Sequence, residues 1–319
     1  MYERYYNFTG SPFQLTPDTR FFYGSRGHSR AIAHLTFGLA QGEGFVIVTG
    51  EVGAGKTTLI ERLLSQLDRD TYAVAHVNTT QVSGDDLFRL ALSGFGVDAA
   101  QASKSALLLR FEEALRDHRL AGRRCLLIVD EVQNLTPAAL EELRMLSNIT
   151  ENGRASLQTI LMGQPQFRRL LATPDLDQLR QRVLASYHLG PLSPAETRAY
   201  IEHRLTTVGW RGNPHWEDAA FTAVYDHTGG IPRRINRLCG RVLLYGALER
   251  AGTISAAMVL HTAEELAEDL EGLPAAPVAA AASTPGDLLH RVEALEAQVT
   301  RQKRVFQRLM DVLGGAGES

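Results

Sequence analysis

The sequence predicts an α/β protein in which helices cover a parallel sheet, followed by a smaller helical domain. Between residues 26 and 190, short apolar runs alternate with helical patterns, which is the order expected of strand–helix–strand units. A glycine-rich motif directly follows the first of these runs, and from Ser193 onward the pattern becomes entirely helical. A length of 319 residues fits about two such domains.

The composition is that of an ordinary globular protein, with 44% hydrophobic and 22% charged residues. A net charge of −3 excludes a global field that would attract nucleic acid or anionic lipid. Cys125 and Cys239 lie far apart without metal-binding spacing, so reduced thiols are expected. The sequence shows no signal peptide and no apolar run of the ~18 residues that a membrane span needs. A cytoplasmic location is therefore expected.

Residues 1–25 are expected to form an N-terminal arm. Eight of the 23 aromatic residues lie within the first 23 positions, without a helical period. We favour an extended arm that packs on the body of the protein, because exposed aromatic patches are uncommon on monomers. A strip that binds a partner is the alternative.

Residues 26–190 are expected to form the α/β domain. Its apolar runs are bounded by polar and glycine-containing segments, as strands in a covered parallel sheet are. The candidate strands are Phe45–Thr49, Ala73–Val77, Cys125–Val129, Leu157–Met162 and Tyr187–Leu189.

A phosphate-binding loop follows the first candidate strand. It matches G-x-x-x-x-G-K-[ST] in full, and a helical pattern from Thr58 to Leu67 follows it, which is the setting that gives the motif its meaning. Loop amides and the start of the helix attract phosphate. Lys56 is expected to reach the β- and γ-phosphates of ATP, and the Thr57 hydroxyl to hold Mg²⁺. The residues predicted to bind nucleotide here are Gly50, Glu51, Val52, Gly53, Ala54, Gly55, Lys56, Thr57 and Thr58.

A pair of carboxylates ends the third candidate strand. Four apolar residues precede Asp130 and Glu131, so a buried strand is expected to deliver both acids to the sheet edge where ligands of α/β folds bind. Asp130 is predicted to hold Mg²⁺, and Glu131 to polarise the attacking water. Such a pair favours hydrolysis over phosphate transfer to a small acceptor.

Residues 191–270 are expected to form the helical domain. Ser193 and Glu196 have the spacing of a capping box, and further helices are expected over Glu217–Thr228, Pro232–Arg250 and Ser255–Asp269. Gly229 and Gly230 can end one helix, and Pro232 can begin the next. Two arginines, Arg233 and Arg234, then fall in its first turn, where the helix dipole disfavours them. A γ-phosphate at the domain interface would compensate them, and solvated surface arginines are the alternative.

The C-terminal region is predicted to contain a linker and a helix. Residues 271–286 are rich in proline and alanine, as flexible or semi-extended linkers are. Residues 287–313 are predicted to form a short coiled coil, because apolar residues recur there at spacings of four and three. A single amphipathic helix folded back on the body is the alternative. The apolar positions are Leu288, Val292, Leu295, Val299, Val305, Phe306, Leu309 and Leu313.

With these motifs, the chain resembles the AAA+ superfamily and, within it, the ExeA-like (general secretion pathway protein A) ATPases. The resemblance runs from about Tyr5 to Glu265 and includes residues 11–18, 22–25, 163–165, 179–183 and 229–236. Among these relatives, the chain looks most like the secretion ATPases encoded with exosortase/PEP-CTERM and exopolysaccharide gene clusters. ExeA relatives often add a membrane span and a peptidoglycan-binding module, neither of which this sequence predicts.

The resemblance implies roles for residues outside the two nucleotide motifs. Arg233 matches the sensor-2 arginine of the lid, and Gln164 occupies the sensor-1 position, where many relatives carry asparagine. Arg182 fits an arginine finger offered to a neighbouring subunit, with Arg180 as second choice, and a salt bridge at the helix end is the alternative for either. Tyr23, together with Gly24 and His28, lies where the family's pre-loop segment borders the adenine.

The function implied is that of an ATP-hydrolysing motor or switch that supports envelope export of polysaccharide or sorted surface protein. The resemblance implies a homo-oligomer, and the C-terminal helix is expected to recruit an envelope or membrane-associated partner, which would bring the protein to the inner membrane. A DNA-associated ATPase similar to transposition targeting ATPases is one alternative, although slight acidity does not favour nucleic acid. A slow ATP-gated signalling switch is the other.

Overall fold

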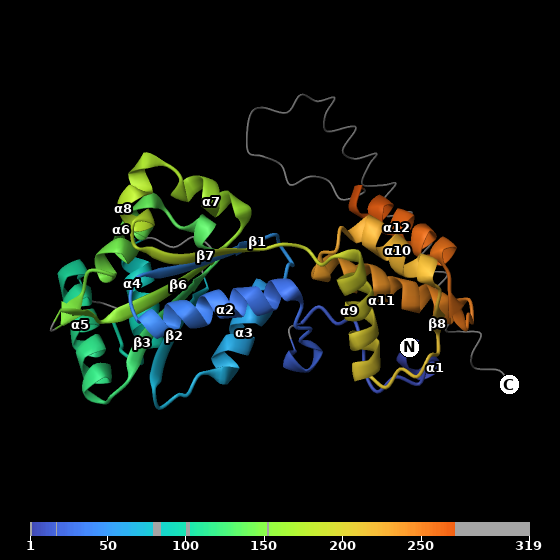
Figure 1. Cartoon of the computed structure of the whole chain (residues 1–319), viewed down its shortest axis with the longest axis horizontal. Helices are drawn as coiled ribbons and strands as arrows, with labels where there is room; N and C mark the ends of the chain where they lie inside the picture. Colours follow the sequence, from blue (N-terminus) through green and yellow to red (C-terminus); the bar gives the residue numbers. More distant parts are fainter. Residues whose placement is uncertain (1, 17, 79–83, 100–102, 152, 272–319) are drawn as a thin grey trace, which may run out of the picture. The chain divides into compact units, whose positions relative to one another are not determined.

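The computed structural model describes residues 2–16, 18–78, 84–99, 103–151 and 153–271 (Figure 1). Met1–Thr262 belong to one compact unit, which holds every site discussed below, and a second unit begins at Ala263. The predicted linker and coiled coil lie outside the described residues from position 272 on. They remain predictions, as do the domain boundaries.

A five-stranded parallel sheet forms the centre of the α/β part, in the order β2-β3-β6-β1-β7. All five predicted strands are confirmed, although β7 begins four residues before the predicted position. The order places β1 inside the sheet, so the loop that follows it leaves from the interior of the carboxyl edge. The strands are β1 (Phe45–Gly50), β2 (Tyr72–Asn78), β3 (Arg124–Asp130), β6 (Leu157–Gly163) and β7 (Val183–Leu189).

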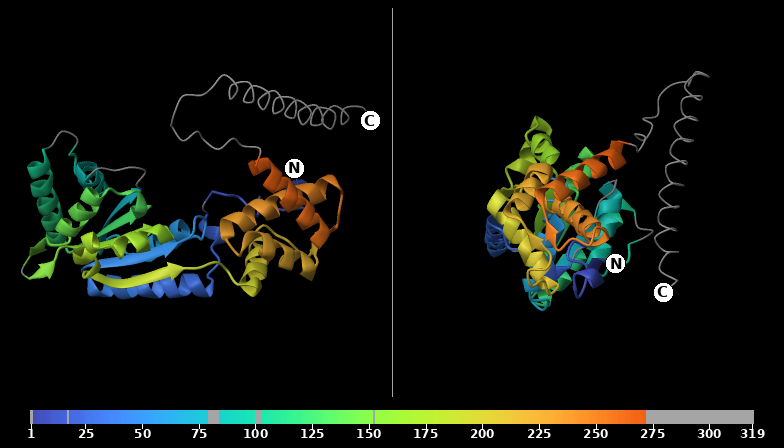
Figure 2. Two further views of the ribbon diagram at one scale, coloured as in Figure 1. Left: turned by 90° about the horizontal axis from the view of Figure 1, so that it is seen from above. Right: turned by 90° about the vertical axis from the view of Figure 1, so that its right-hand side faces the viewer.

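Helices cover both faces of this sheet (Figure 1). On one face, α2 (Arg26–Gln41) and α3 (Lys56–Gln66) bury leucines such as Leu35 and Leu59 against Val46 and Val48. Figure 2 shows α2 running along the edge strand β7, which it contacts. On the other face lie α4 (Gly84–Gly94), α5 (Lys104–Leu120), α6 (Pro137–Leu146), α7 (Pro165–Leu171) and α8 (Asp177–Arg180). Because β1 and β6 are covered on both sides, their residues are all buried.

Short elements join these helices and strands. A two-residue hairpin, β4 (Thr150–Glu151) with β5 (Arg154–Ala155), precedes β6. Single 3-10 turns follow β3 and α7, as η2 (Val132–Asn134) and η3 (Pro174–Leu176).

The C-terminal part of the described chain is helical, as predicted. Its helices are α9 (Pro194–Thr207), α10 (Asp218–Thr228), α11 (Pro232–Leu248) and α12 (Ala256–Glu271). The predicted capping box is present at the start of α9. The structure adds one feature to the entirely helical pattern, a parallel pairing of β8 (His215–Trp216) with β9 (Thr253–Ile254). None of the described helices combines the length and apolar character that a membrane span requires.

The aromatic arm packs on the body of the protein, so its aromatic side chains do not form a free strip. Tyr6, Phe8, Phe13 and Phe21 are each at least 92% buried. The arm is extended only in part, because it contains the short helix α1 (Tyr2–Tyr5) and the turn η1 (Thr19–Phe21). It contacts α11 and α9 through these two elements.

Candidate functional site

The glycine-rich loop connects β1 to α3 and depends on two glycines. Gly53 and Gly55 have φ angles of +83° and +100°, which side chains other than glycine rarely adopt. A Cβ on Gly53 would lie 2.3 Å from the Arg233 Cβ, and one on Gly55 would lie 2.8 Å from the His28 Nε2. The loop thus requires glycine both for its backbone conformation and for the close approach of neighbouring elements.

Lys56 is the first residue of α3, and only 5% of it is exposed. Its ammonium group donates to the carbonyl oxygens of Gly50, at 2.9 Å, and Glu51, at 3.3 Å. Burial lowers the pKa of Lys56, while the carboxylates of Glu131, Asp130 and Glu51 act in the opposite direction. A cationic group is thus held inside the loop, close to the path of a bound polyphosphate.

Thr57 and Asp130 bring a hydroxyl and a carboxylate together at the end of the sheet. The Thr57 hydroxyl donates to Asp130 Oδ2 at 3.5 Å. Asp130 is 95% buried, and this burial raises the pKa of its carboxyl group. Both groups offer hard oxygen ligands of the type that Mg²⁺ prefers, and Mg²⁺ commonly takes one or two protein ligands alongside water and phosphate oxygens. Within the described ranges, no group of three or more His, Cys, Asp and Glu residues could hold a metal ion.

Glu131 is held by two glutamine side chains. Gln133 Nε2 and Gln164 Nε2 donate to the same Glu131 oxygen, at 2.5 Å and 3.1 Å. Gln133 also accepts from the backbone N–H of Gln164 at 2.9 Å, so it joins η2 to the start of α7. Glu131 itself has a φ of +52°, a conformation that costs a residue with a side chain about 1–3 kcal/mol and is found mainly at functional sites.

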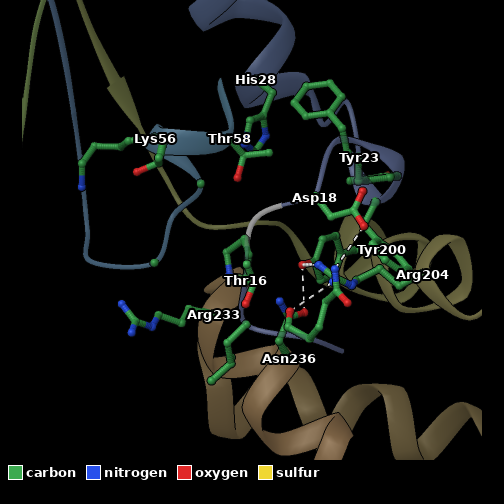
Figure 3. A pocket seen from close by; sticks show the side chains of 18 of the residues that line it. Thr16, Asp18, Tyr23, His28, Lys56, Thr58, Tyr200, Arg204, Arg233 and Asn236 are labelled. Carbon is green, nitrogen blue, oxygen red and sulfur yellow. Dashed lines mark hydrogen bonds between the residues drawn. The ribbon is translucent and has the colours of Figure 1, made fainter. Parts of the chain in front are cut away.

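The helical part of the chain reaches this loop through α11. The Arg233 N–H donates to the Gly53 carbonyl oxygen at 3.2 Å, so the first turn of α11 rests on the loop. In Figure 3, the Arg233 side chain extends from the start of α11 alongside the loop that carries Lys56. This contact accounts for one of the orphan N–H groups at the start of α11.

A cavity of about 380 Å³ opens beside the loop (Figure 3). This volume lies within the ~300–1,000 Å³ range of small-molecule sites. It is lined by Gln14, Leu15, Thr16, Asp18, Phe21, Phe22, Tyr23, His28, Val52, Gly53, Gly55, Lys56, Thr57, Thr58, Glu131, Leu192, Tyr200, Arg204, Pro232, Arg233 and Asn236. The structure therefore brings together the phosphate loop, Glu131, the predicted adenine-side residue Tyr23 and the predicted lid arginine Arg233.

A buried hydrogen-bond network joins the arm to the helices at this cavity. Arg204, 94% buried, donates to the backbone oxygens of Pro12 at 2.5 Å and Gln14 at 3.3 Å, and to the Tyr200 hydroxyl at 2.8 Å. Tyr200 in turn donates to Asn236 Oδ1 at 2.9 Å. The sequence reasoning missed these three side chains, and it also missed Gln133. The only signal for Gln133 was a polar residue two positions after Glu131.

His28 faces the loop from α2. A hydrogen bond of 2.7 Å joins its Nδ1 to the Ser25 hydroxyl, and burial lowers the pKa of the imidazole. The ring lies beside Gly55, with its Nε2 2.8 Å from the position of a Cβ on that glycine.

The two candidate finger residues do not line the cavity. Arg182 lies directly before β7 and donates to Ser147 at the end of α6, at 2.9 Å to its carbonyl oxygen and 3.1 Å to its hydroxyl. Arg180 is half exposed and forms a 2.6 Å ion pair with Asp177, three residues earlier on α8. Arg182 is thus engaged within its own subunit, whereas Arg180 is the more accessible of the two.

Comparison with known proteins agrees with this geometry. Residues 39–171 match the family model of an AAA domain. The chain is 38% identical over 248 residues to general secretion pathway protein A of Aeromonas hydrophila. That match covers 76% of this chain and 44% of the relative, so the chain spans less than half of that protein's length.

Solved structures show the same fold at low sequence identity. Cdc6p from Pyrobaculum aerophilum is 17% identical, with a TM-score of 0.64 over 81% of this chain and 75% of that one. RuvB, a Holliday junction branch migration motor from Thermotoga maritima, is 22% identical, with a TM-score of 0.54 over 82% of this chain and 76% of that one. The chain is similar to both in fold alone.

Proposed function

Because the chain belongs to the AAA+ ATPases of the ExeA-like family, we propose that it binds ATP with Mg²⁺ and hydrolyses it. One observation carries the proposal. Lys56, the Thr57–Asp130 pair and Glu131 converge at one end of the sheet, beside a cavity that Arg233 borders from the lid.

Each group has a chemical task in this proposal. The loop amides and Lys56 bind the phosphates, and Thr57 with Asp130 would hold Mg²⁺, which would supply positive charge beside the phosphate oxygens. Glu131 accepts a proton from the attacking water. Gln133 and Gln164 orient the Glu131 carboxylate by hydrogen bonds to one of its oxygens.

Lid movement is proposed to follow from the Gly53–Arg233 contact. The backbone hydrogen bond between them ties α11 to the phosphate loop, and Arg233 lines the same cavity as the loop, where a γ-phosphate would bind. Loss of that phosphate would remove the charge that offsets two arginines at the start of a helix. Hydrolysis would thereby release α11.

Export across the bacterial envelope is the proposed setting. It is supported by the 38% identity to general secretion pathway protein A, of which this chain covers 44%. We propose a homo-oligomer that acts at the inner membrane from the cytoplasmic side through an envelope protein partner. The identity of the neighbouring genes would distinguish export of polysaccharide from export of a sorted surface protein.

The primary test is phosphate release from ATP by wild-type protein and by Lys56→Ala. We expect Mg²⁺-dependent release by the wild type and no detectable nucleotide binding by the variant. Lys104→Ala is the control, since Lys104 is an exposed lysine that pairs with the buried Glu142 and does not line the cavity. Equal activity of the Lys56→Ala and Lys104→Ala variants would refute the assignment of the phosphate loop.

Two alternative functions have separate readouts. A DNA-associated ATPase would bind duplex DNA with an affinity that falls steeply with salt. A slow signalling switch would retain ATP tightly and turn over far below the ~1–10³ s⁻¹ of typical enzymes, on the order of once per minute. We expect neither result.

A further inference from the structure

A second cavity lies at the opposite end of the sheet from the phosphate loop, among the amino ends of its strands. Its volume is about 180 Å³. Arg124 and Cys125 begin β3, Tyr72 begins β2, and Gln158 is the second residue of β6. The lining residues are Gly42, Tyr72, Arg119, Gly122, Arg123, Arg124, Cys125, Ala155, Ser156 and Gln158.

Three arginines and no acidic residue line this cavity. Arg119 is committed to the β4–β5 hairpin, where it donates to backbone oxygens of Glu151 and Ala155 and forms a 3.4 Å ion pair with the Glu151 carboxylate. The Arg124 guanidinium stacks on the Tyr72 ring at 5.6 Å and lies 2.0 Å from the position of a Cβ on Gly42. Positive charge therefore exceeds negative charge at this place.

Two buried donors at the cavity have no acceptor within the part of the chain that the structure describes. These are Arg123 Nε and the side-chain amide nitrogen of Gln158, which is 97% buried. A buried donor left without a partner costs about 1–3 kcal/mol. In native structures such a donor commonly binds a water molecule or an ion. Gly42, which caps α2, and Gly122, which follows α5, line the cavity, yet neither supplies an acceptor to Arg123 Nε.

The charges also converge on one point. Arg123 and Arg119 both act to lower the pKa of the Cys125 thiol, although its burial outweighs them and raises the pKa to about 12. Cys125 lines the same cavity as both arginines.

We propose that this cavity binds a small oxyanion, of the phosphate or carboxylate class. A volume of about 180 Å³ is below the ~300–1,000 Å³ of clefts for drug-sized ligands, so a second nucleotide does not fit. An oxyanion offers charge-assisted acceptors to arginine, the side chain best suited to phosphate and carboxylate. It would accept from the guanidinium groups of Arg123 and Arg124, both of which line the cavity.

The test is a thermal unfolding titration of the full chain with sodium phosphate, sodium acetate and sodium chloride at equal ionic strength. It is done on the Lys56→Ala variant, so that the phosphate loop does not contribute. Anion binding at tenfold its Kd should raise Tm by about 3 °C or more beyond the chloride control. The phosphate and acetate arms identify which oxyanion class the cavity takes.

Arg123→Gln and Arg124→Gln should each lose most of this shift, while Arg110→Gln should keep it. Arg110 is an exposed arginine on α5 that does not line the cavity. Phosphate line broadening in ³¹P NMR gives a second measurement if a variant is too unstable for unfolding curves. A shift equal to that of chloride, or one that persists in both glutamine variants, would overturn the proposal. Because the phosphate loop is disabled in every sample, this result is independent of whether the chain hydrolyses ATP.

Discussion

Replacing Gly53 with alanine should uncouple the lid helix from the phosphate loop. The phosphate-binding motif leaves this position open to any residue, so the motif alone predicts no defect. In the structure, the new Cβ would lie 2.3 Å from the Arg233 Cβ, a separation that real atoms do not reach. Since both atoms are fixed to backbone, the start of α11 must move away from the loop.

Two contributions set how much folding stability and ATP affinity the Gly53→Ala variant should lose. A side chain in the left-handed region costs about 1–2 kcal/mol of folding stability. Loss of the Arg233–Gly53 backbone hydrogen bond removes about 0.5–1.5 kcal/mol more. If that second amount is lost from the lid-closed, ATP-bound state, ATP affinity falls about 2- to 13-fold. Hydrolysis should fall further, because Arg233 is displaced with α11.

Gly96→Ala is the matched control. Gly96 has a φ of +84°, against +83° for Gly53, and no atom lies within 4 Å of its added Cβ. Both variants carry the same backbone cost, and only Gly53→Ala carries the collision. ATP affinity is measured with a fluorescent analogue and turnover by phosphate release. If Gly53→Ala matches Gly96→Ala in both, with both proteins folded, the proposed coupling of lid and loop is wrong.

Three further predictions concern assembly, the metal site and the tail. Arg182→Ala should keep ATP affinity and lose hydrolysis if Arg182 is a finger, and mixing it with Lys56→Ala protein should restore some activity. If Arg180→Ala alone behaves this way, the more exposed arginine is the finger. Asp130→Asn should abolish Mg²⁺-dependent hydrolysis and raise Tm at pH 7 without nucleotide. Burial raises the pKa of Asp130, so the folded state loses stability as pH rises through that pKa and the carboxyl group ionises, a loss that asparagine avoids. An unchanged or lower Tm would contradict this. Truncation after Leu273 should leave basal ATPase within a few-fold of wild type and abolish partner recruitment, whereas loss of basal hydrolysis would mean that the tail belongs to the core.

The nucleotide site could be predicted from sequence where its parts are local. The phosphate loop is one uninterrupted segment between a strand and a helix, and Asp130 with Glu131 ends an apolar strand. In both cases the motif and its flanking strand or helix pattern predict the same local structure. The structure brings the two motifs together, with Thr57 within 3.5 Å of Asp130.

Other features depend on tertiary neighbours and could not be predicted. Gln133 matters only because α7 starts beside it and presents Gln164. Arg204 carries a charge yet is 94% buried, because the arm supplies its acceptors from about 190 residues away. The first four residues of β7 lie at a sheet edge and alternate between partly buried and exposed, unlike the fully buried residues of β1 and β6.

The shortest strands could not be predicted from the sequence because of their length. The β4–β5 and β8–β9 pairs contribute two residues per strand, too few for an alternating pattern to be recognised.

The most direct test of the account compares Glu131→Gln with wild type for ATP affinity and single-turnover hydrolysis. We expect an unchanged Kd, because Glu131 is not a phosphate ligand, and a hydrolysis rate lower by about 10²–10⁴, the usual contribution of a general base. The variant keeps a side chain of similar size beside Gln133 and Gln164, so loss of folding is not expected. Hydrolysis at the wild-type rate would show that Glu131 is not the base and that the site works by another arrangement.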